Sequence, residues 1–154
     1  MTQLLDVNVW LAAVAQHNAH HRIVTDWMDA QRQPLAFCRI TQMSLLRLLS
    51  NPPTMQGDVV TRRGAWRVFE ALMADDRVRI LSEPDGLESR WMKFSARNDH
   101  SHRLWTDDYL AAFAEMAGAT FVTLDTAIEA RYPSVDVLTL RETPRPRRVS
   151  IIQR

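Results

Sequence analysis

A chain of 154 residues is long enough for one compact domain with a hydrophobic core and too short for two domains of ordinary size. Hydrophobic residues make up 46% of the chain and charged residues 24%, a balance that excludes disordered and fibrous proteins. The net charge of +1 excludes a strongly basic protein that coats nucleic acid, although local basic and acidic patches remain compatible with it.

In chain order, the predicted elements are a strand at 4–7, helices at 9–15 and 19–30, a strand at 35–38, a helix at 41–50, a helix that reaches Met73, a strand at 78–81, helices at 87–94 and 107–117, and strands at 120–124 and 135–138. Helix ends are marked at Pro34, which breaks the second helix, and at Gly118, a natural C-terminal cap. Asp58 is expected to cap the helix on which Trp66 and Phe69 share a face.

Membrane and redox functions have little support in the sequence. No apolar run approaches the roughly 20 residues that span a bilayer, and the N-terminus MTQLLDVNVW lacks the features of a signal peptide, so we expect a cytoplasmic protein without a membrane partner. The single cysteine, Cys38, lies in the apolar segment LAFC and is expected to be a buried thiol.

Strands that alternate with helices predict an α/β fold, a parallel sheet with helices on both faces. In such sheets the ligand crevice lies beyond the carboxyl ends of the strands. Residues 1–140 are therefore expected to form the domain, and residues 141–154, with prolines and five arginines, a basic C-terminal arm. A loosely ordered tail is the preferred interpretation of the arm, and contact with RNA or a partner is the alternative.

Three aspartates are the main candidates for chemistry. Asp6 and Asp125 follow predicted strands, and Asp107 lies in line with the buried stripe of its helix, whereas Asp108 is expected to face solvent and is kept as a reserve ligand. Clustered carboxylates repel one another unless a cation lies between them, so Mg²⁺ or Mn²⁺ is the expected cofactor. Helix capping is the alternative role for Asp6 and for Asp125, taken singly.

Gln42 occupies an equivalent inward position on an earlier helix, beside a Thr41 cap. It offers a neutral oxygen to a metal, or it is a core glutamine bonded to backbone.

Basic and aromatic residues permit contact with RNA. Arginine holds phosphate through a planar fork of donors, and a set of five lies in the middle of the chain: Arg39, Arg47, Arg62, Arg63 and Arg67. Arginine-rich codon usage is the alternative explanation. Five histidines are expected at the surface, without a structural zinc site. His100 and His102 lie in a loop that leads to Asp107, so they are candidates for contact with RNA. The five tryptophans are expected mostly in the core.

Two other classes are disfavoured. A receiver domain needs a lysine at a late strand end, and the only lysine, Lys93, lies within a predicted helix. Nucleotide-binding folds need glycine-rich phosphate loops, and the four glycines are scattered singly.

The segments LLDVNVW, CRITQMSLLRLL, LWTDDYLAAFA and FVTLD resemble the PIN-domain toxins of VapBC toxin-antitoxin systems over residues 1 to about 140. The resemblance implies a five-stranded parallel sheet and a divalent-metal endoribonuclease that cleaves structured RNA, commonly transfer RNA. It also implies a homodimer and inhibition by a cognate antitoxin protein. Asp6, Asp107 and Asp125 match the first, third and fourth acidic positions, and Asn8 and Thr123 match polar positions of the same pocket.

The second acidic position departs from the family pattern, because Gln42 stands where most members have glutamate. Three carboxylates instead of four are expected to bind a cation more weakly. The alternative function is therefore a PIN domain that binds RNA or protein without cutting.

Overall fold

The computed structural model describes residues 1–142, so all but two residues of the predicted basic arm, 141–154, lie outside the described residues. The strands are β1 (Gln3–Leu5), β2 (Leu35–Phe37), β3 (Val78–Ile80), β4 (Thr120–Thr123) and β5 (Val137–Thr139). The helices are α1 (Val7–Val14), α2 (His21–Ala30), α3 (Arg39–Leu49), α4 (Pro52–Met55), the 3-10 turn η1 (Gln56–Asp58), α5 (Arg62–Met73), α6 (Leu87–Ser95), α7 (Trp105–Ala117) and α8 (Ile128–Arg131). No helix within residues 1–142 is both long enough and apolar enough to cross a bilayer.

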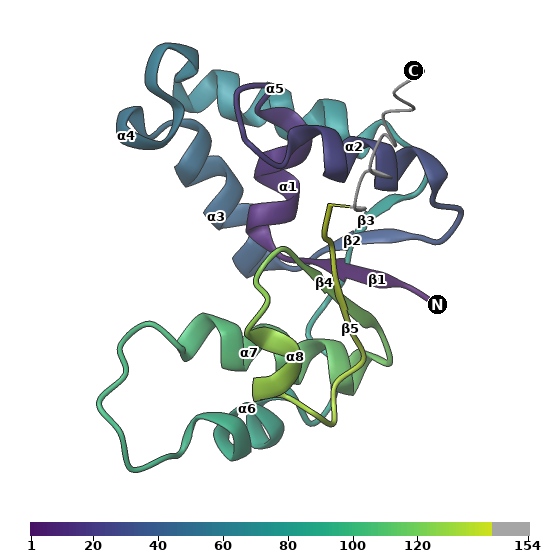
Figure 1. Ribbon diagram of the computed structural model, residues 1–154, viewed down its shortest axis with the longest axis vertical. Helices are drawn as coiled ribbons and strands as arrows, with labels where there is room; N and C mark the ends of the chain where they lie inside the picture. The colour runs from purple at the N-terminus through teal and green to yellow at the C-terminus, as the bar shows by residue number, and fades with distance from the viewer. Residues whose placement is uncertain (143–154) are drawn as a thin grey trace, which may run out of the picture.

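The five strands form one parallel sheet in the order β3-β2-β1-β4-β5 (Figure 1). All five predicted strands and the predicted α/β class are confirmed. The strand order runs from β1 outward through β2 and β3 on one side, and through β4 and β5 on the other. In open parallel sheets, the crevice outside such a reversal of strand order is where ligands bind.

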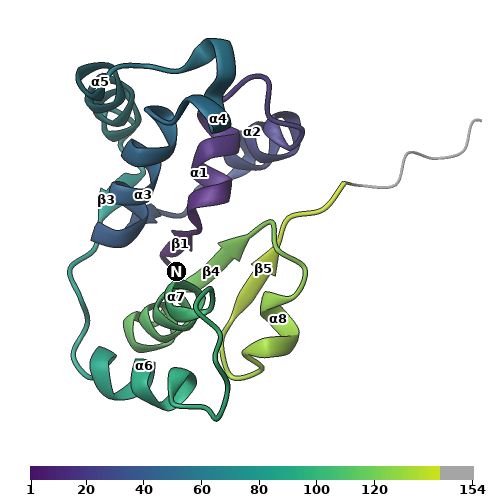
Figure 2. The same ribbon diagram turned by 90° about the vertical axis from the view of Figure 1, so that its left-hand side faces the viewer.

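Helices cover both faces of this sheet, with α1, α2, α3 and α5 on one side and α6, α7 and α8 on the other (Figures 1 and 2). Consecutive strand residues enter opposite cores: Leu5 and Val122 pack with the first set of helices, and Leu4 and Phe121 pack with the second. Burial on both faces explains why the central strands contain the consecutive apolar residues Leu4-Leu5, Leu35-Ala36-Phe37 and Phe121-Val122. Cys38 is buried in the second core, as expected.

The helix that was predicted to begin at Asp58 begins at Arg62 as α5. Before it, Pro52 and Pro53 start the short helix α4, because the fixed φ angle of proline suits the first turn of a helix, and Asp58 lies in η1. The cap of α5 is Thr61, whose hydroxyl accepts a hydrogen bond from the Gly64 N–H at 3.0 Å. The prediction that Asp58 caps this helix is therefore wrong. At the other marked end, Gly118 ends α7 in the left-handed conformation, as predicted.

Candidate functional site

Asp6 lies at the carboxyl end of β1, where it begins α1. Its carboxylate accepts hydrogen bonds from the Val7 N–H at 2.7 Å and from the Thr123 hydroxyl at 2.9 Å, and only 7% of the residue is exposed. Burial raises the pKa of Asp6 to about 6; the Thr123 bond lowers it, and the nearby carboxylates of Asp107 and Asp125 raise it further. Asp6 is thus both a helix cap and a buried acid that experiences the charges of two others.

Thr123 connects the ends of β1 and β4. Its side chain is fully buried, donates to Asp6 and accepts a hydrogen bond from the Asp125 N–H at 3.1 Å. The exposed Asp125 carboxylate accepts from the Ala127 N–H at 2.9 Å and so shapes the turn into α8. The two strand ends therefore present their aspartates at one edge of the sheet.

Asp107 lies in the first turn of α7, half-buried, and pairs with the guanidinium of Arg131 at 3.3 Å. Burial raises the pKa of Asp107, Arg131 lowers it, and Asp125 and Asp108 raise it, with a net shift above the usual value. Asp107 therefore belongs to the same acidic group as Asp6 and Asp125, which we call the acidic site.

Asp108 was expected to face solvent, and this prediction is wrong. Only 7% of Asp108 is exposed, and its carboxylate accepts a short hydrogen bond from the hydroxyl of Tyr132. Burial, and then this bond, raise the pKa of Tyr132. Asp108 holds the end of α8 against α7, so it is the more buried of the two neighbouring aspartates.

Gln42 lies in α3 with 4% of its surface exposed, as the inward prediction required. Its side-chain oxygen accepts a hydrogen bond from the Arg39 guanidinium, which lies one helical turn earlier. Thr41 closes the start of α3 through a reciprocal bond with the Cys38 backbone. In the first turn of α1, the side-chain oxygen of Asn8 is buried and has no hydrogen-bond partner within residues 1–142.

The chemistry of the acidic site suits a divalent cation. Asp6, Asp107 and Asp125 offer carboxylate oxygens, the ligands that Mg²⁺ and Mn²⁺ prefer. Burial, with repulsion by Asp107 and Asp125, raises the pKa of Asp6, and a bound cation would favour its charged form. The unpaired oxygen of Asn8 adds a neutral acceptor close in sequence. In the part of the chain that the structure describes, however, no three His, Cys, Asp or Glu side chains lie close enough to hold a metal ion together. Arg131 supplies a positive charge to Asp107 in this arrangement.

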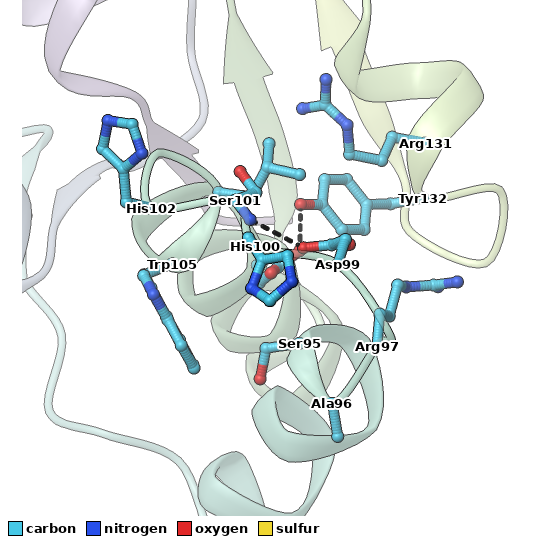
Figure 3. A pocket seen from close by; sticks show the side chains of 12 residues that line it. Ser95, Ala96, Arg97, Asp99, His100, Ser101, His102, Trp105, Arg131 and Tyr132 are labelled. Carbon is cyan, nitrogen blue, oxygen red and sulfur yellow. Dashed lines mark hydrogen bonds between the residues drawn. The ribbon is translucent and has the colours of Figure 1, made fainter.

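A pocket of about 640 Å³ opens beside the acidic site (Figure 3). Its wall comes from the end of α6, the loop that follows, the start of α7 and the end of α8. The lining includes Arg97, His100, His102, Trp105 and Arg131. The pocket and the acidic site meet at Arg131, which lines the first and pairs with an aspartate of the second.

The residues predicted to contact RNA lie in three places. His100 and His102 are exposed and line the pocket. Arg39 is exposed beside Gln42, and Arg47 is exposed further along α3. The prediction of surface histidines is confirmed for four of the five, because His21 is half-buried and its ring contacts the Ala12 carbonyl.

Arg131, Tyr132 and Trp105 were not identified from the sequence as residues beside the acidic site. Trp66 and Trp105 are 49% and 56% exposed, so the prediction that the tryptophans lie in the core holds only for the other three. Ile128 and the C-cap residue Tyr132 are both buried at either end of the four-residue helix α8. One turn gives too few positions for a periodic pattern, so no sequence signal placed Arg131 near the acidic site.

Comparison with known proteins gives a consistent result. The PIN domain family model matches residues 4–132. The chain is 42% identical to Ribonuclease VapC41 of Mycobacterium tuberculosis over 130 residues, which cover 80% of this chain and 89% of that protein. It is 32% identical to Ribonuclease VapC29 of the same organism over 138 residues, with 90% and 96% covered.

Among solved structures, the fold resembles that of VapBC2 from Rickettsia felis bound to a DNA fragment from its promoter, with a TM-score of 0.67, 14% identity, and 92% of this chain and all of that chain covered. The family model spans β1 to α8 and so includes all three aspartates of the acidic site. With its five-stranded parallel sheet and its identity to two VapC ribonucleases, this chain belongs to the PIN-domain family and, within it, to the VapC group.

Proposed function

We propose that this protein is a metal-dependent endoribonuclease that hydrolyses phosphodiester bonds in RNA, the toxin of a toxin-antitoxin pair. The observation that carries the proposal is that Asp6, Asp107 and Asp125 lie near the reversal of strand order in a PIN domain, close enough for the charges of Asp107 and Asp125 to act on Asp6. The names of the relatives, which are called ribonucleases, support the same activity. The substrate class is structured RNA, with transfer RNA as the first candidate.

The residues of the acidic site have separate roles in this proposal. Asp6, Asp107 and Asp125 would hold the cation, Mg²⁺ or Mn²⁺, which when bound lowers the pKa of water and stabilises negative charge on phosphate oxygens. Asp6 or Asp107 would accept the proton from the attacking water. Thr123 keeps the Asp6 carboxylate in place by donating a hydrogen bond to it.

The arginines beside the acidic site would bind the flanking phosphates. Arg131 contacts Asp107, and Arg39 contacts Gln42, so each guanidinium lies next to a residue of the site. Transfer of either guanidinium to an RNA phosphate would free its neighbour in the site. RNA binding and completion of the acidic site are then coupled.

The proposed partners are a cognate antitoxin protein and a second copy of the chain, and the proposed location is the cytoplasm. Solved relatives of the same fold are VapBC complexes, which supports the antitoxin.

A second candidate function is RNA or protein binding without cleavage. The specific observation in its favour is that the second acidic position is Gln42, which is engaged by Arg39. A metal titration with transfer RNA separates the two functions, because a binding module shows affinity but no products that depend on Mn²⁺ or Mg²⁺.

The decisive experiment measures cleavage of transfer RNA by the wild-type protein and by two charge-matched variants. Asp107→Asn removes a carboxylate of the acidic site and should reduce cleavage by at least about a hundredfold. Asp26→Asn removes an exposed carboxylate on α2 and should leave cleavage unchanged. Equal activity of Asp107→Asn and the wild type would refute the assignment.

A further inference from the structure

The pocket beside the acidic site has features that neither the fold nor the acidic chemistry requires. It is formed where the loop between α6 and α7 passes the end of α8, and its volume of about 640 Å³ lies in the range of small-ligand sites. Figure 3 shows Trp105 and His102 on one side of the pocket and Arg97, Arg131 and Tyr132 on the other. The pocket therefore has the aromatic side chain of Trp105 on one side and two arginines on the other.

Trp105 is an exposed aromatic residue whose position is fixed by contacts with Trp91. Although 56% of the residue is exposed, its carbonyl accepts a hydrogen bond from the Trp91 indole N–H at 3.2 Å. The two indole rings also meet edge to face, with centroids 6.2 Å apart, and Trp91 in turn packs against Tyr109. An exposed ring whose position is already fixed loses little conformational entropy when a flat ligand stacks on it.

The guanidinium groups of the opposite wall are placed to bind an anion. The Nε–H of Arg97 donates to the Phe94 carbonyl at 3.0 Å, which positions the exposed side chain while its terminal nitrogens have no partner within residues 1–142. Arg131 lines the pocket while one of its terminal nitrogens contacts Asp107.

The two acids of the pocket wall are engaged by other groups. The Asp108 carboxylate is covered by the Tyr132 hydroxyl, and the Asp99 carboxylate accepts from the Ser101 N–H at 2.9 Å. Among residues 1–142, neither carboxylate pairs with Arg97 or Arg131, so the terminal nitrogens of Arg97 and the second terminal nitrogen of Arg131 are available to a phosphate.

We propose that this pocket binds one nucleotide of the RNA strand, with the base stacked on Trp105 and the phosphate held by Arg97 and Arg131. This inference rests on the proposed nuclease function. Because Arg131 lines the pocket and also contacts Asp107, a nucleotide bound in the pocket would direct the adjacent phosphodiester bond toward the acidic site. A flat exposed aromatic ring opposite guanidinium groups is the combination that single-stranded nucleic acid uses. The pocket thus contributes to the choice of cleavage position.

The test measures binding of a fluorescein-labelled single-stranded RNA oligonucleotide in EDTA, where metal-dependent cleavage cannot proceed. Trp105→Ala should weaken binding by about tenfold, and Trp105→Phe should restore most of the affinity because it keeps a stacking face. Arg97→Gln should lower the slope of log affinity against log salt by about 0.7, the value for one phosphate contact with a single strand. Circular dichroism establishes that each variant is folded.

Two matched controls keep the test specific. Trp66→Ala removes an equally exposed tryptophan from α5, on the other side of the sheet, and Lys93→Gln removes a positive charge from the exposed surface of α6 without touching the pocket. Both controls should bind the oligonucleotide like the wild type. Wild-type affinity in Trp105→Ala and Arg97→Gln would overturn the proposal, as would the absence of any oligonucleotide binding by the wild type.

The two proposals fail in distinguishable ways. If the nuclease function is wrong, Mn²⁺ produces no cleavage, yet the pocket variants still weaken RNA binding. If the pocket proposal is wrong, Asp107→Asn abolishes cleavage while the pocket variants bind and cleave normally. If an acidic peptide binds more tightly than the oligonucleotide and Trp105→Ala weakens that peptide binding, the pocket is a protein-docking site. This result would also overturn the nucleotide assignment.

Discussion

Asp6→Asn should make the metal-free protein more stable at neutral pH while it removes a metal ligand. The Asp6 carboxylate is buried beside other acids, and its pKa rises from the usual 3.8 to about 6. A folded-state pKa above the unfolded one means that the folded protein binds the proton more tightly, so stability falls as pH rises from about 4 to about 6 and stays lower above that range. Asparagine has no charge to bury and still caps α1.

The pKa difference sets the size of the effect. A change from 3.8 to about 6 corresponds to about 3 kcal/mol of unfolding free energy at pH 7.5, which is the expected upper gain for Asp6→Asn in EDTA. Urea denaturation followed by tryptophan fluorescence measures it, because Trp10 is fully buried in the core. At pH 4 the gain should nearly vanish. Added Mn²⁺ should then stabilise the wild type by mass action and leave the variant unchanged.

Two results would refute this reasoning. One is an equal stability difference at pH 4 and pH 7.5, which would show that the carboxylate charge is not the cause. The other is a variant less stable than the wild type throughout this range in EDTA. Asp26→Asn, an exposed change on α2, is the control and should show no pH-dependent gain.

Three further changes test other contacts. Arg131→Gln should raise the affinity for Mn²⁺, measured by calorimetry, up to about fivefold, because it removes the guanidinium charge that pairs with Asp107. Weaker Mn²⁺ binding would contradict this expectation. Gln42→Glu supplies a fourth carboxylate and should lower the Mn²⁺ concentration for half-maximal binding, and an unchanged value would place Gln42 outside the metal site. Arg77→Ala should lower the free energy of unfolding, measured in urea, by about 2 kcal/mol, because the Arg77 guanidinium donates to the carbonyls of Met28 and Gln31 at the end of α2. The control Arg79→Ala changes an exposed neighbour and should have little effect. Equal losses in the two variants would contradict the role of these bonds.

The central strands were predictable from the sequence because they contain short apolar runs that are buried on both faces of the sheet. The start of α5 was not, because it depends on how the chain returns after Pro53. The Val60 N–H donates to the Leu49 carbonyl at 3.1 Å, a contact between α3 and the loop that directs the chain to Thr61. No local pattern in residues 58–61 specifies that contact.

The positions of the aspartates were predictable, but their burial was not. A helical stripe distinguishes a buried from an exposed face only when one side of the helix meets solvent. Residues 108–114 of α7 are all buried, so Asp107 and Asp108 could not be ranked from periodicity. The pairing of Arg131 with Asp107 depends on α8, a helix of four residues that is too short for a clear periodic pattern.

The position of β1 in the centre of the sheet has a consequence for synthesis of the protein. Asp6 leaves the ribosome first, whereas the strand that pairs with β1 on the acidic side, β4, is among the last elements to be translated. A nascent chain, or one truncated before residue 105, contains Asp6 but neither Asp107 nor Asp125. The acidic site on which the proposed nuclease activity depends is therefore complete only when almost the whole domain has been made.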